Sequence, residues 1–263
     1  PVVRVRDLVQ KIKKRIILDG VGLEVYRGEC FGLFGLRGAG KTALLHILAG
    51  IDRFRSGSVE VLGYDIRKSE RFKHQLGLVT QGKSLFQDLR AGENLDFLAA
   101  LKNAGRENCH RVIERFQLTD YLSLPVTALE AGVYQRLALA CALLNEPELL
   151  LADDLFQSID PASHHIILRE LKEYLACGGT CILSFNNMDG EMLLLALDTF
   201  GISVSTGSAC NAGSTEISHV LRAIGLDPEL ARGSLRFSLG RQNTASEVDT
   251  VINALSGIIE LQA

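Results

Sequence analysis

An eight-residue segment, GLRGAGKT at residues 35–42, constrains the fold of this chain more than any other part of it. It fits the spacing G-x-x-x-x-G-K-[ST], which forms a phosphate-binding loop when it joins a strand to a helix. The apolar residues 30–34 (CFGLF) predict that strand, and residues 43–50 (ALLHILAG) predict the helix. Glycines let backbone N–H groups turn toward phosphate oxygens, and the helix N-terminus adds its dipole. The sequence therefore predicts a nucleotide-binding loop in an α/β fold.

Two side chains of the loop have separate expected roles. Lys41 is expected to bridge the β- and γ-phosphates, and Thr42 to place its hydroxyl on Mg²⁺. The predicted nucleotide-binding residues of the loop are Gly35, Leu36, Arg37, Gly38, Ala39, Gly40, Lys41 and Thr42.

A second group of candidate functional residues lies at residues 148–154 (ELLLADD), where an apolar strand is predicted. The strand ends in two acids, and ligands bind at the carboxyl ends of the strands in a parallel sheet. Asp153 suits the Mg²⁺ role. Asp154 is expected to point to the other side of the strand and to polarise a water molecule.

Composition narrows the class of protein. The chain has 263 residues, of which 47% are hydrophobic and 22% charged, so it is expected to form globular domains. No apolar run approaches the ~20 residues of a membrane helix, and no secretory signal opens the sequence. Six scattered cysteines form no CxxC pair, which favours free thiols in a reducing, cytoplasmic compartment. The basic residues 11–15 (KIKKR) lack interleaved aromatics and indicate a hairpin turn, so no nucleic acid is expected.

With the phosphate loop and the acidic strand end in place, residues 1–187 resemble the nucleotide-binding subunit of an ABC transporter. The segments SGSVEVLGYDI, GLVTQ, FQDLRAGENLDFLAAL, LEAGVYQRLALACALL and SIDP occur in that family's order. The resemblance implies a P-loop NTPase domain with a helical subdomain at about residues 85–145 that docks on a transmembrane permease. It also implies that Gln81, in the Q-loop, reaches the metal, and that the subunit acts as a homo- or heterodimer.

Several family positions hold other residues here. The family signature, usually LSGGQ, corresponds to Leu129, Glu130, Ala131, Gly132 and Val133. Glu130 in place of the serine would repel a bound phosphate. Asp154 is one methylene shorter than the family's glutamate, Asn186 stands for the H-loop histidine, and Ile12 replaces the aromatic residue that stacks on adenine. Together these departures predict that ATP binding survives while hydrolysis is slow or absent.

The remaining residues, 188–263, predict a compact α+β module. It opens with an acidic helix from residue 190, and a capping box, Thr244-x-x-Glu247, begins its closing helix. Net charge changes here: residues 1–188 carry 24 basic and 22 acidic groups, whereas residues 189–263 carry 4 and 9.

This module resembles the C-terminal segment of the cysteine desulfurases, which are PLP enzymes. STGSACNAG matches the loop with that family's persulfide-forming cysteine, here Cys210, and RGSLRFSLGR matches the strand whose arginine, here Arg236, holds the substrate carboxylate. A desulfurase also needs a lysine to hold PLP. No lysine follows Lys172, so PLP and desulfurase activity are not expected.

The two resemblances meet between about residues 181 and 190, where SFNNMD fits both families. The ABC-like part ends there before its usual final strands, and the module is expected to cover the sheet edge left open.

Three functions remain open. The first is an ATP-binding subunit with Mg²⁺ and ATP as ligands, in the cytoplasm at the inner face of the membrane beside its permease. The second is a sulfur-transfer protein with persulfide on Cys210. The third is a chimera in which neither part is active.

Overall fold

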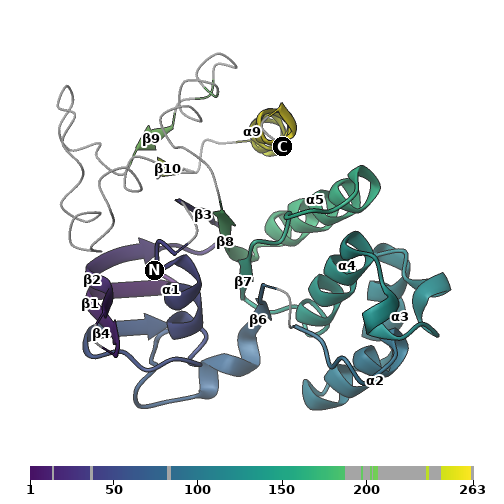
Figure 1. Cartoon of the computed structure of the whole chain (residues 1–263), viewed down its shortest axis with the longest axis horizontal. Helices are drawn as coiled ribbons and strands as arrows, with labels where there is room; N and C mark the ends of the chain where they lie inside the picture. The colour runs from purple at the N-terminus through teal and green to yellow at the C-terminus, as the bar shows by residue number, and fades with distance from the viewer. Residues whose placement is uncertain are drawn as a thin grey trace.

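The computed structural model describes residues 1–13, 15–35, 38–81, 84–186, 197, 202, 204–206, 235–236 and 244–261. Two four-stranded sheets form its centre, one antiparallel in the order β2-β1-β4-β5 and one parallel in the order β3-β8-β7-β6. Figure 1 shows the antiparallel sheet on one side of the parallel sheet and a group of helices on the other. The P-loop NTPase fold predicted from the sequence is therefore confirmed.

The antiparallel sheet is built from two hairpins. Its strands are β1 (Val3–Ile12), β2 (Arg15–Val25), β4 (Ser56–Val61) and β5 (Tyr64–Asp65). Ile12 pairs with Arg15 at the end of the first hairpin, which confirms that the basic stretch forms a turn. Alternate residues such as Val3, Val5 and Val59 are buried, and they pack with the inward face of helix α1 (Lys41–Leu48) in one apolar cluster.

The parallel sheet contains β3 (Cys30–Gly35), β6 (Leu76–Val79), β7 (Leu149–Asp153) and β8 (Thr180–Asn186). Every residue of β7 is buried, as expected of a strand covered on both faces. Its neighbour β8 lies between β7 and β3. The phosphate loop at the end of β3 and the acids Asp153 and Asp154 at the end of β7 consequently lie at the same, carboxyl end of the sheet, with β8 between their strands.

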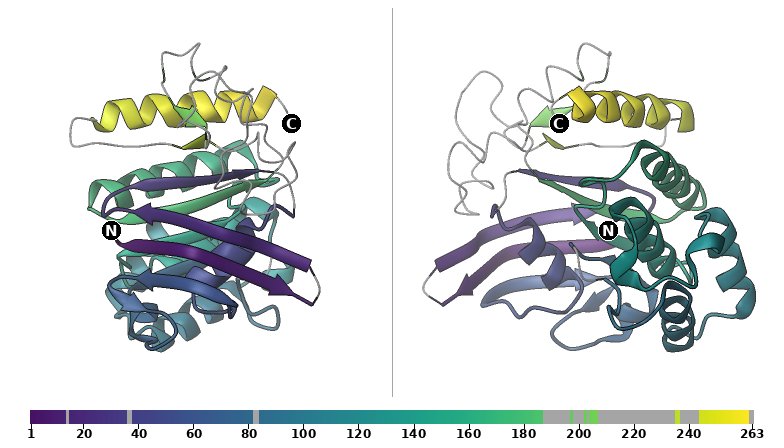
Figure 2. Two further views of the ribbon diagram at one scale, coloured as in Figure 1. Left: turned by 90° about the vertical axis from the view of Figure 1, so that its left-hand side faces the viewer. Right: turned by 45° about the vertical axis from the view of Figure 1, so that its right-hand side comes forward.

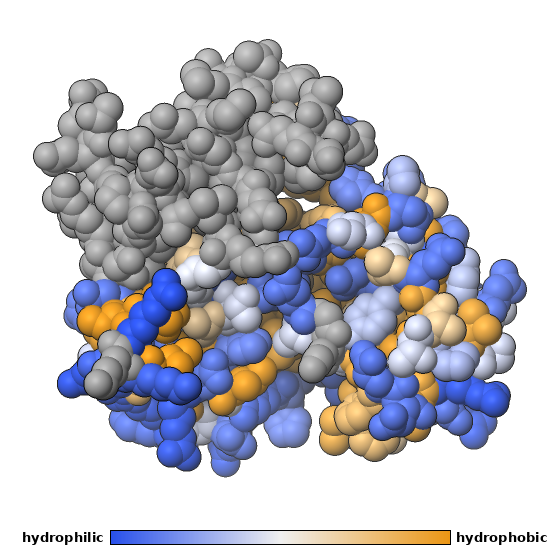
Figure 3. All heavy atoms as spheres, viewed as in Figure 1, coloured by the Kyte–Doolittle hydropathy of each residue, from blue (hydrophilic) through white to orange (hydrophobic). Residues whose placement is uncertain are grey.

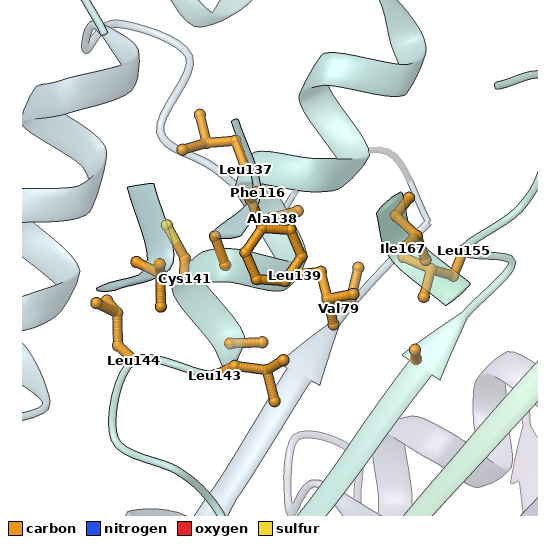
Figure 4. Packing of buried hydrophobic residues seen from close by; sticks show 14 of the residues in the cluster. Val79, Phe116, Leu137, Ala138, Leu139, Cys141, Leu143, Leu144, Leu155 and Ile167 are labelled. Carbon is orange, nitrogen blue, oxygen red and sulfur yellow. The ribbon is translucent and has the colours of Figure 1, made fainter. Parts of the chain in front are cut away.

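Helices form the third part of the molecule. They are α2 (Ala91–Leu101), α3 (Arg106–Arg115), α4 (Ala131–Ala142) and α5 (Pro161–Ala176), with short 3-10 turns at Arg71–Gln75, Thr119–Tyr121 and Val126–Ala128. Figure 4 shows the ring of Phe116, from the end of α3, among side chains of α4 and beside Val79 of β6. One apolar core therefore joins the helices to the parallel sheet.

Only part of the C-terminal segment lies within the described residues. It contributes β9 (Ser205–Thr206), β10 (Leu235–Arg236) and helix α9 (Ala245–Leu261). The predicted capping box is confirmed: the Thr244 N–H donates to the Glu247 carboxylate over 2.7 Å, and the Glu247 N–H donates to the Thr244 hydroxyl over 3.3 Å. Helix α9 packs next to α5 (Figure 2), and Lys172 of α5 forms an ion pair with Asp249 of α9 at 2.9 Å. Strand β10 lies near β3, the edge strand of the parallel sheet.

The predicted helix from residue 190, apart from Leu197, and the Cys210 loop lie outside the described residues. The predicted division at residue 187 stays a prediction. Among the described residues, no helix has both the length and the apolar character that crossing a bilayer requires.

Candidate nucleotide-binding site

The phosphate loop begins where β3 ends and closes on the first turn of α1. Leu36 and Arg37 lie outside the described residues. Gly38 and Gly40 have φ angles of 91° and 93°, which residues with a side chain rarely adopt. A Cβ at Gly40 would lie 2.9 Å from Leu18 Cδ2, so the close approach of the loop to β2 also requires glycine. The position of the loop thus depends on backbone conformations that glycine permits.

The N-terminus of α1 suits an anion. Gly40 is its N-cap residue and supplies no capping side chain, and its first turn contains no acid. Helix N-termini of this kind have backbone N–H groups without intrahelical partners and a positive dipole end. A phosphate group fits both features.

Lys41, the first residue of α1, lies beside the two acids at the end of β7, Asp153 and Asp154. Burial lowers the pKa of Lys41 to about 8, while the negative charges of Asp153 and Asp154 oppose this shift. The desolvation cost shows that the ammonium has exchanged water for a protein environment. A phosphate in the loop would add negative charge beside this ammonium and stabilise its protonated form.

Asp153 is held by two hydroxyl groups. It is 1% exposed. Thr42 Oγ1 donates to Asp153 Oδ2 over 2.6 Å, and Ser184 Oγ, from β8, donates to Asp153 Oδ1. Each carboxylate oxygen therefore has a fixed donor, which sets the orientation of the carboxylate at the mouth of the phosphate loop. A hydroxyl and a carboxylate together are oxygen ligands of the kind that Mg²⁺ prefers, so the residues present fit this ion.

Ser184 was missed by the sequence-based prediction. It is buried, and register places it directly opposite Asp153 across β7 and β8. Its carbonyl accepts from the Asp154 N–H at 3.1 Å, and its hydroxyl lies 3.3 Å from the same N–H. The available signal was a polar residue inside the apolar strand sequence CILSF.

Asp154 and Gln81 meet beside Asp153. Asp154 has a φ of 56°, in the left-handed region that aspartate tolerates better than most residues. Gln81 Nε2 donates to Asp154 Oδ2 over 2.9 Å and to Gln157 Oε1 over 3.2 Å. The structure therefore brings the predicted Q-loop glutamine and the predicted water-polarising acid into direct contact, although 73 positions separate them in the sequence.

The other residues predicted from the two family resemblances lie at separate positions in the structure. Asn186 ends β8 and is paired in register with Gly35, the first residue of the phosphate loop. The signature segment, residues 129–133, lies at the start of α4, where Glu130 is the exposed N-cap residue. Ile12 is 49% exposed at the end of the first hairpin. Arg236 belongs to β10, whereas Cys210 lies outside the described residues.

Gly132, in the signature segment, lies close against the start of α5. A Cβ there would lie 2.0 Å from Asp160 Oδ2 and 2.4 Å from Ser163 Oγ. Asp160 is the N-cap residue of α5, and its Oδ1 accepts from the Ser163 N–H at 2.8 Å. The N-terminal turns of α4 and α5 thus pack against one another through a glycine.

The fold and this convergence of loop, lysine and acids define a P-loop nucleotide-binding domain. The profile of the family described as ABC transporter matches residues 18–157, and a second profile, described as aminotransferase class-V, matches residues 144–251. The chain belongs to the ABC transporter family, and the second match confirms the predicted joining of a desulfurase-like segment at its C-terminal side.

Curated relatives support the same assignment. The chain is 32% identical over 194 residues to the Nod factor export ATP-binding protein I of Ralstonia nicotianae, which covers 72% of this chain and 60% of that relative. The protein of the same name from Paraburkholderia xenovorans is 30% identical over 250 residues, covering 90% of this chain and 82% of that one.

The chain also resembles the solved structure of the ATP-binding subunit of an ABC transporter, with a TM-score of 0.66 and 26% identity. That match covers 76% of this chain and 82% of the other.

Proposed function

We propose that the chain binds Mg·ATP as the ATP-binding subunit of an ABC-type transporter and hydrolyses it slowly. The observation that carries this proposal is the hydrogen bond from Thr42, in the phosphate loop, to Asp153 at the end of β7, beside the partly desolvated Lys41. Titration calorimetry of the full chain with Mg·ATP tests it. Saturable binding of one nucleotide per chain is the expected result, and the absence of binding heat or of a thermal shift would overturn it.

Three features support slow hydrolysis. Glu130 places a carboxylate at the N-terminus of α4, where it interacts favourably with the helix dipole. The same carboxylate would repel a phosphate bound by a second subunit. The short side chain of Asp154 is engaged by Gln81, and Asn186, in place of a histidine, has no titratable group.

Lengthening Asp154 is expected to increase hydrolysis. Asp154→Glu restores the methylene that the family's glutamate has, at a cost of about 1 kcal/mol for a longer side chain at positive φ. General-base catalysis is worth about 10²–10⁴ in rate, so steady-state phosphate release is expected to rise at least about tenfold. Asp154→Asn is the control and should show no rise. Equal rates for the wild type and Asp154→Glu would contradict a limiting role for Asp154.

Ser184 is expected to support the metal through Asp153. Ser184→Ala removes the donor to Asp153 Oδ1 and is expected to weaken Mg²⁺-dependent nucleotide binding about tenfold, because residues that orient a metal ligand typically contribute about this much to affinity. Binding of ATP in EDTA should change little, and Ser184→Thr should restore the Mg²⁺ effect. Calorimetry with and without Mg²⁺ measures both. An equal loss in EDTA would indicate a general structural defect.

Nucleotide affinity is expected to depend on pH through Lys41. The pKa of Lys41 is about 8 in the free chain, and bound phosphate favours the charged form, so the pKa is higher in the complex. Below pH 8 the lysine is already protonated and affinity is flat. Above pH 8 binding requires proton uptake, and affinity falls by up to about tenfold per pH unit until the pKa of the complex. Titrations at pH 7, 8 and 9 check this, and Lys41→Ala should remove the slope.

A transmembrane permease is the proposed partner, which would bring the chain to the cytoplasmic face of a membrane. Phe86 and Phe97 form an edge-to-face pair with centroids 4.9 Å apart, both are about half exposed, and Leu101 is 69% exposed. Figure 3 shows apolar side chains gathered at the lower edge of the helical part, around α2. This surface, on the predicted helical subdomain of about residues 85–145, supports docking to an apolar partner segment.

Sulfur transfer through Cys210 is the second candidate, because the aminotransferase class-V match covers both Cys210 and Arg236. In this proposal residues 188–263 form a desulfurase-like unit that accepts persulfide from a complete desulfurase. Mass spectrometry after incubation with an active desulfurase and cysteine is expected to find one added sulfur on Cys210. An unmodified Cys210 thiol would remove this candidate.

A further inference from the structure

Two cysteines that the nucleotide site does not use face each other across the parallel sheet. Cys30 begins β3, Cys181 lies in β8, and the two residues are in register. Their Sγ atoms are 3.2 Å apart, with the Cys181 thiol donating to the Cys30 sulfur. The residues are 151 positions apart in the sequence, so only the sheet brings them together.

The geometry of this pair is compatible with a covalent bond. Neighbouring strands lie about 4.8 Å apart, which falls within the Cα separation of about 4.4–6.8 Å that disulfides span. Both side chains already point toward each other. Cys30 is also the first residue of β3, which is an edge strand of the parallel sheet among the described residues. The sulfurs, now 3.2 Å apart, would have to approach by about 1 Å to reach the disulfide bond length of about 2.05 Å.

The two cysteines differ in burial and in the pKa of the thiol. Cys181 is fully buried, whereas Cys30 is partly exposed. The hydrogen bond from Cys181 lowers the pKa of the Cys30 thiol against the opposing effect of burial. The same hydrogen bond and burial raise the pKa of Cys181. Cys30 therefore suits the role of the attacking thiolate, and Cys181 that of the second thiol.

We propose that Cys30 and Cys181 form an oxidation site that a peroxide converts to a disulfide between β3 and β8. The Cys30 thiolate attacks one peroxide oxygen, the O–O bond breaks, and Cys30 becomes a sulfenic acid as hydroxide leaves and takes a proton. The Cys181 sulfur then attacks the Cys30 sulfur and loses its proton, and the sulfenic oxygen leaves as water. In total two thiols and one hydrogen peroxide give one disulfide and two waters, with the thiols oxidised by two electrons.

The other described thiols lack this arrangement. Burial raises the pKa of Cys141 to about 12, which leaves almost no thiolate at neutral pH. Burial also raises the pKa of Cys109. Cys177 is exposed and offers an internal measure of ordinary reactivity in the same chain.

A bond at this position would act on the sheet rather than on the nucleotide. Cys30 lies at the opposite end of β3 from Gly35, about 16 Å away along an extended strand. The disulfide would tie the two strands together while leaving the phosphate loop in place. Oxidised protein is therefore expected to melt at a higher temperature, by about 5 °C or more, and to bind Mg·ATP as the reduced protein does.

Peptide mapping of the full chain tests the proposal. The reduced protein is treated with hydrogen peroxide until Cys177 is half oxidised, alkylated, and digested without reductant. The expected product is a peptide pair that joins Cys30 to Cys181, about 2 Da lighter than the two thiols and separated by dithiothreitol. Full alkylation of Cys30 and Cys181 at that point, or a Cys30 disulfide to Cys177 or Cys210 instead, would overturn the proposal.

Two variants separate the roles of the thiols. Cys181→Ser should leave Cys30 as a sulfenic acid that a dimedone probe traps, because the second thiol is absent. Cys30→Ser should leave Cys181 unoxidised, because the buried thiol has no partner to react with. Equal dimedone labelling of wild type and Cys181→Ser would show that no second thiol acts. The mapping uses no nucleotide, so it is independent of ATP binding.

Discussion

Replacing Lys41 by alanine is expected to weaken Mg·ATP binding about a hundredfold or more. The ammonium lies at the start of α1 beside Asp153 and Asp154, where burial has already lowered its pKa to about 8. A charge-assisted hydrogen bond to phosphate in such a partly dry site contributes about 2–3 kcal/mol, and its loss leaves the nucleotide charge less neutralised. Titration calorimetry with Mg·ATP measures the difference.

The matched control is Lys68→Ala. Lys68 is 82% exposed and pairs with Asp65 at 3.2 Å, so its removal changes the net charge equally without touching the phosphate loop. Its affinity for Mg·ATP should equal that of the wild type. Identical binding by Lys41→Ala and the wild type would show that nucleotide, if bound, is held elsewhere.

The second large effect is expected from Gly132→Ala. A Cβ would lie 2.0 Å from Asp160 Oδ2 and 2.4 Å from Ser163 Oγ. Asp160 cannot move freely, because it is the N-cap residue of α5 and its carboxylate accepts a hydrogen bond from the Ser163 N–H. Overpacking of this severity costs about 3 kcal/mol, because α4 must move away from α5 or the cap must break. For a chain of this size the melting temperature should fall by about 6–12 °C.

Gly105→Ala is the control for this variant. Gly105 is also a helix-terminal glycine, it has a φ of −70°, and a Cβ there would meet nothing within 4 Å. Its melting temperature should stay within about 2 °C of the wild type. Thermal unfolding followed by circular dichroism compares the two variants. A small effect of Gly132→Ala would mean that the starts of α4 and α5 separate at little cost.

The sequence predicted the nucleotide site in part. The phosphate loop and the acids at the end of β7 were recognised because their spacing and apolar flanks are local features. Ser184 was missed, because its polarity within an apolar strand is a local signal but its partner, Asp153, is set by the pairing of β7 with β8. The tight packing of Gly132 was likewise not predictable. The comparison of residues 129–133 with the family signature concerned phosphate binding and gave no information on packing against Asp160.

Sequence patterns alone were sufficient to recognise the phosphate loop, the family of the chain and the presence of a second, desulfurase-like segment at its C-terminal side. These features depend on short-range patterns: glycine conformations, a lysine at fixed spacing and apolar periodicity. Which side chains come into contact follows from the folded structure. Thr42 and Ser184 reach Asp153 from 111 and 31 positions away, and Cys30 reaches Cys181 across β3 and β8. The physical reason is that strand order and register, which arise from burial over the whole sheet, set contacts between residues distant in sequence.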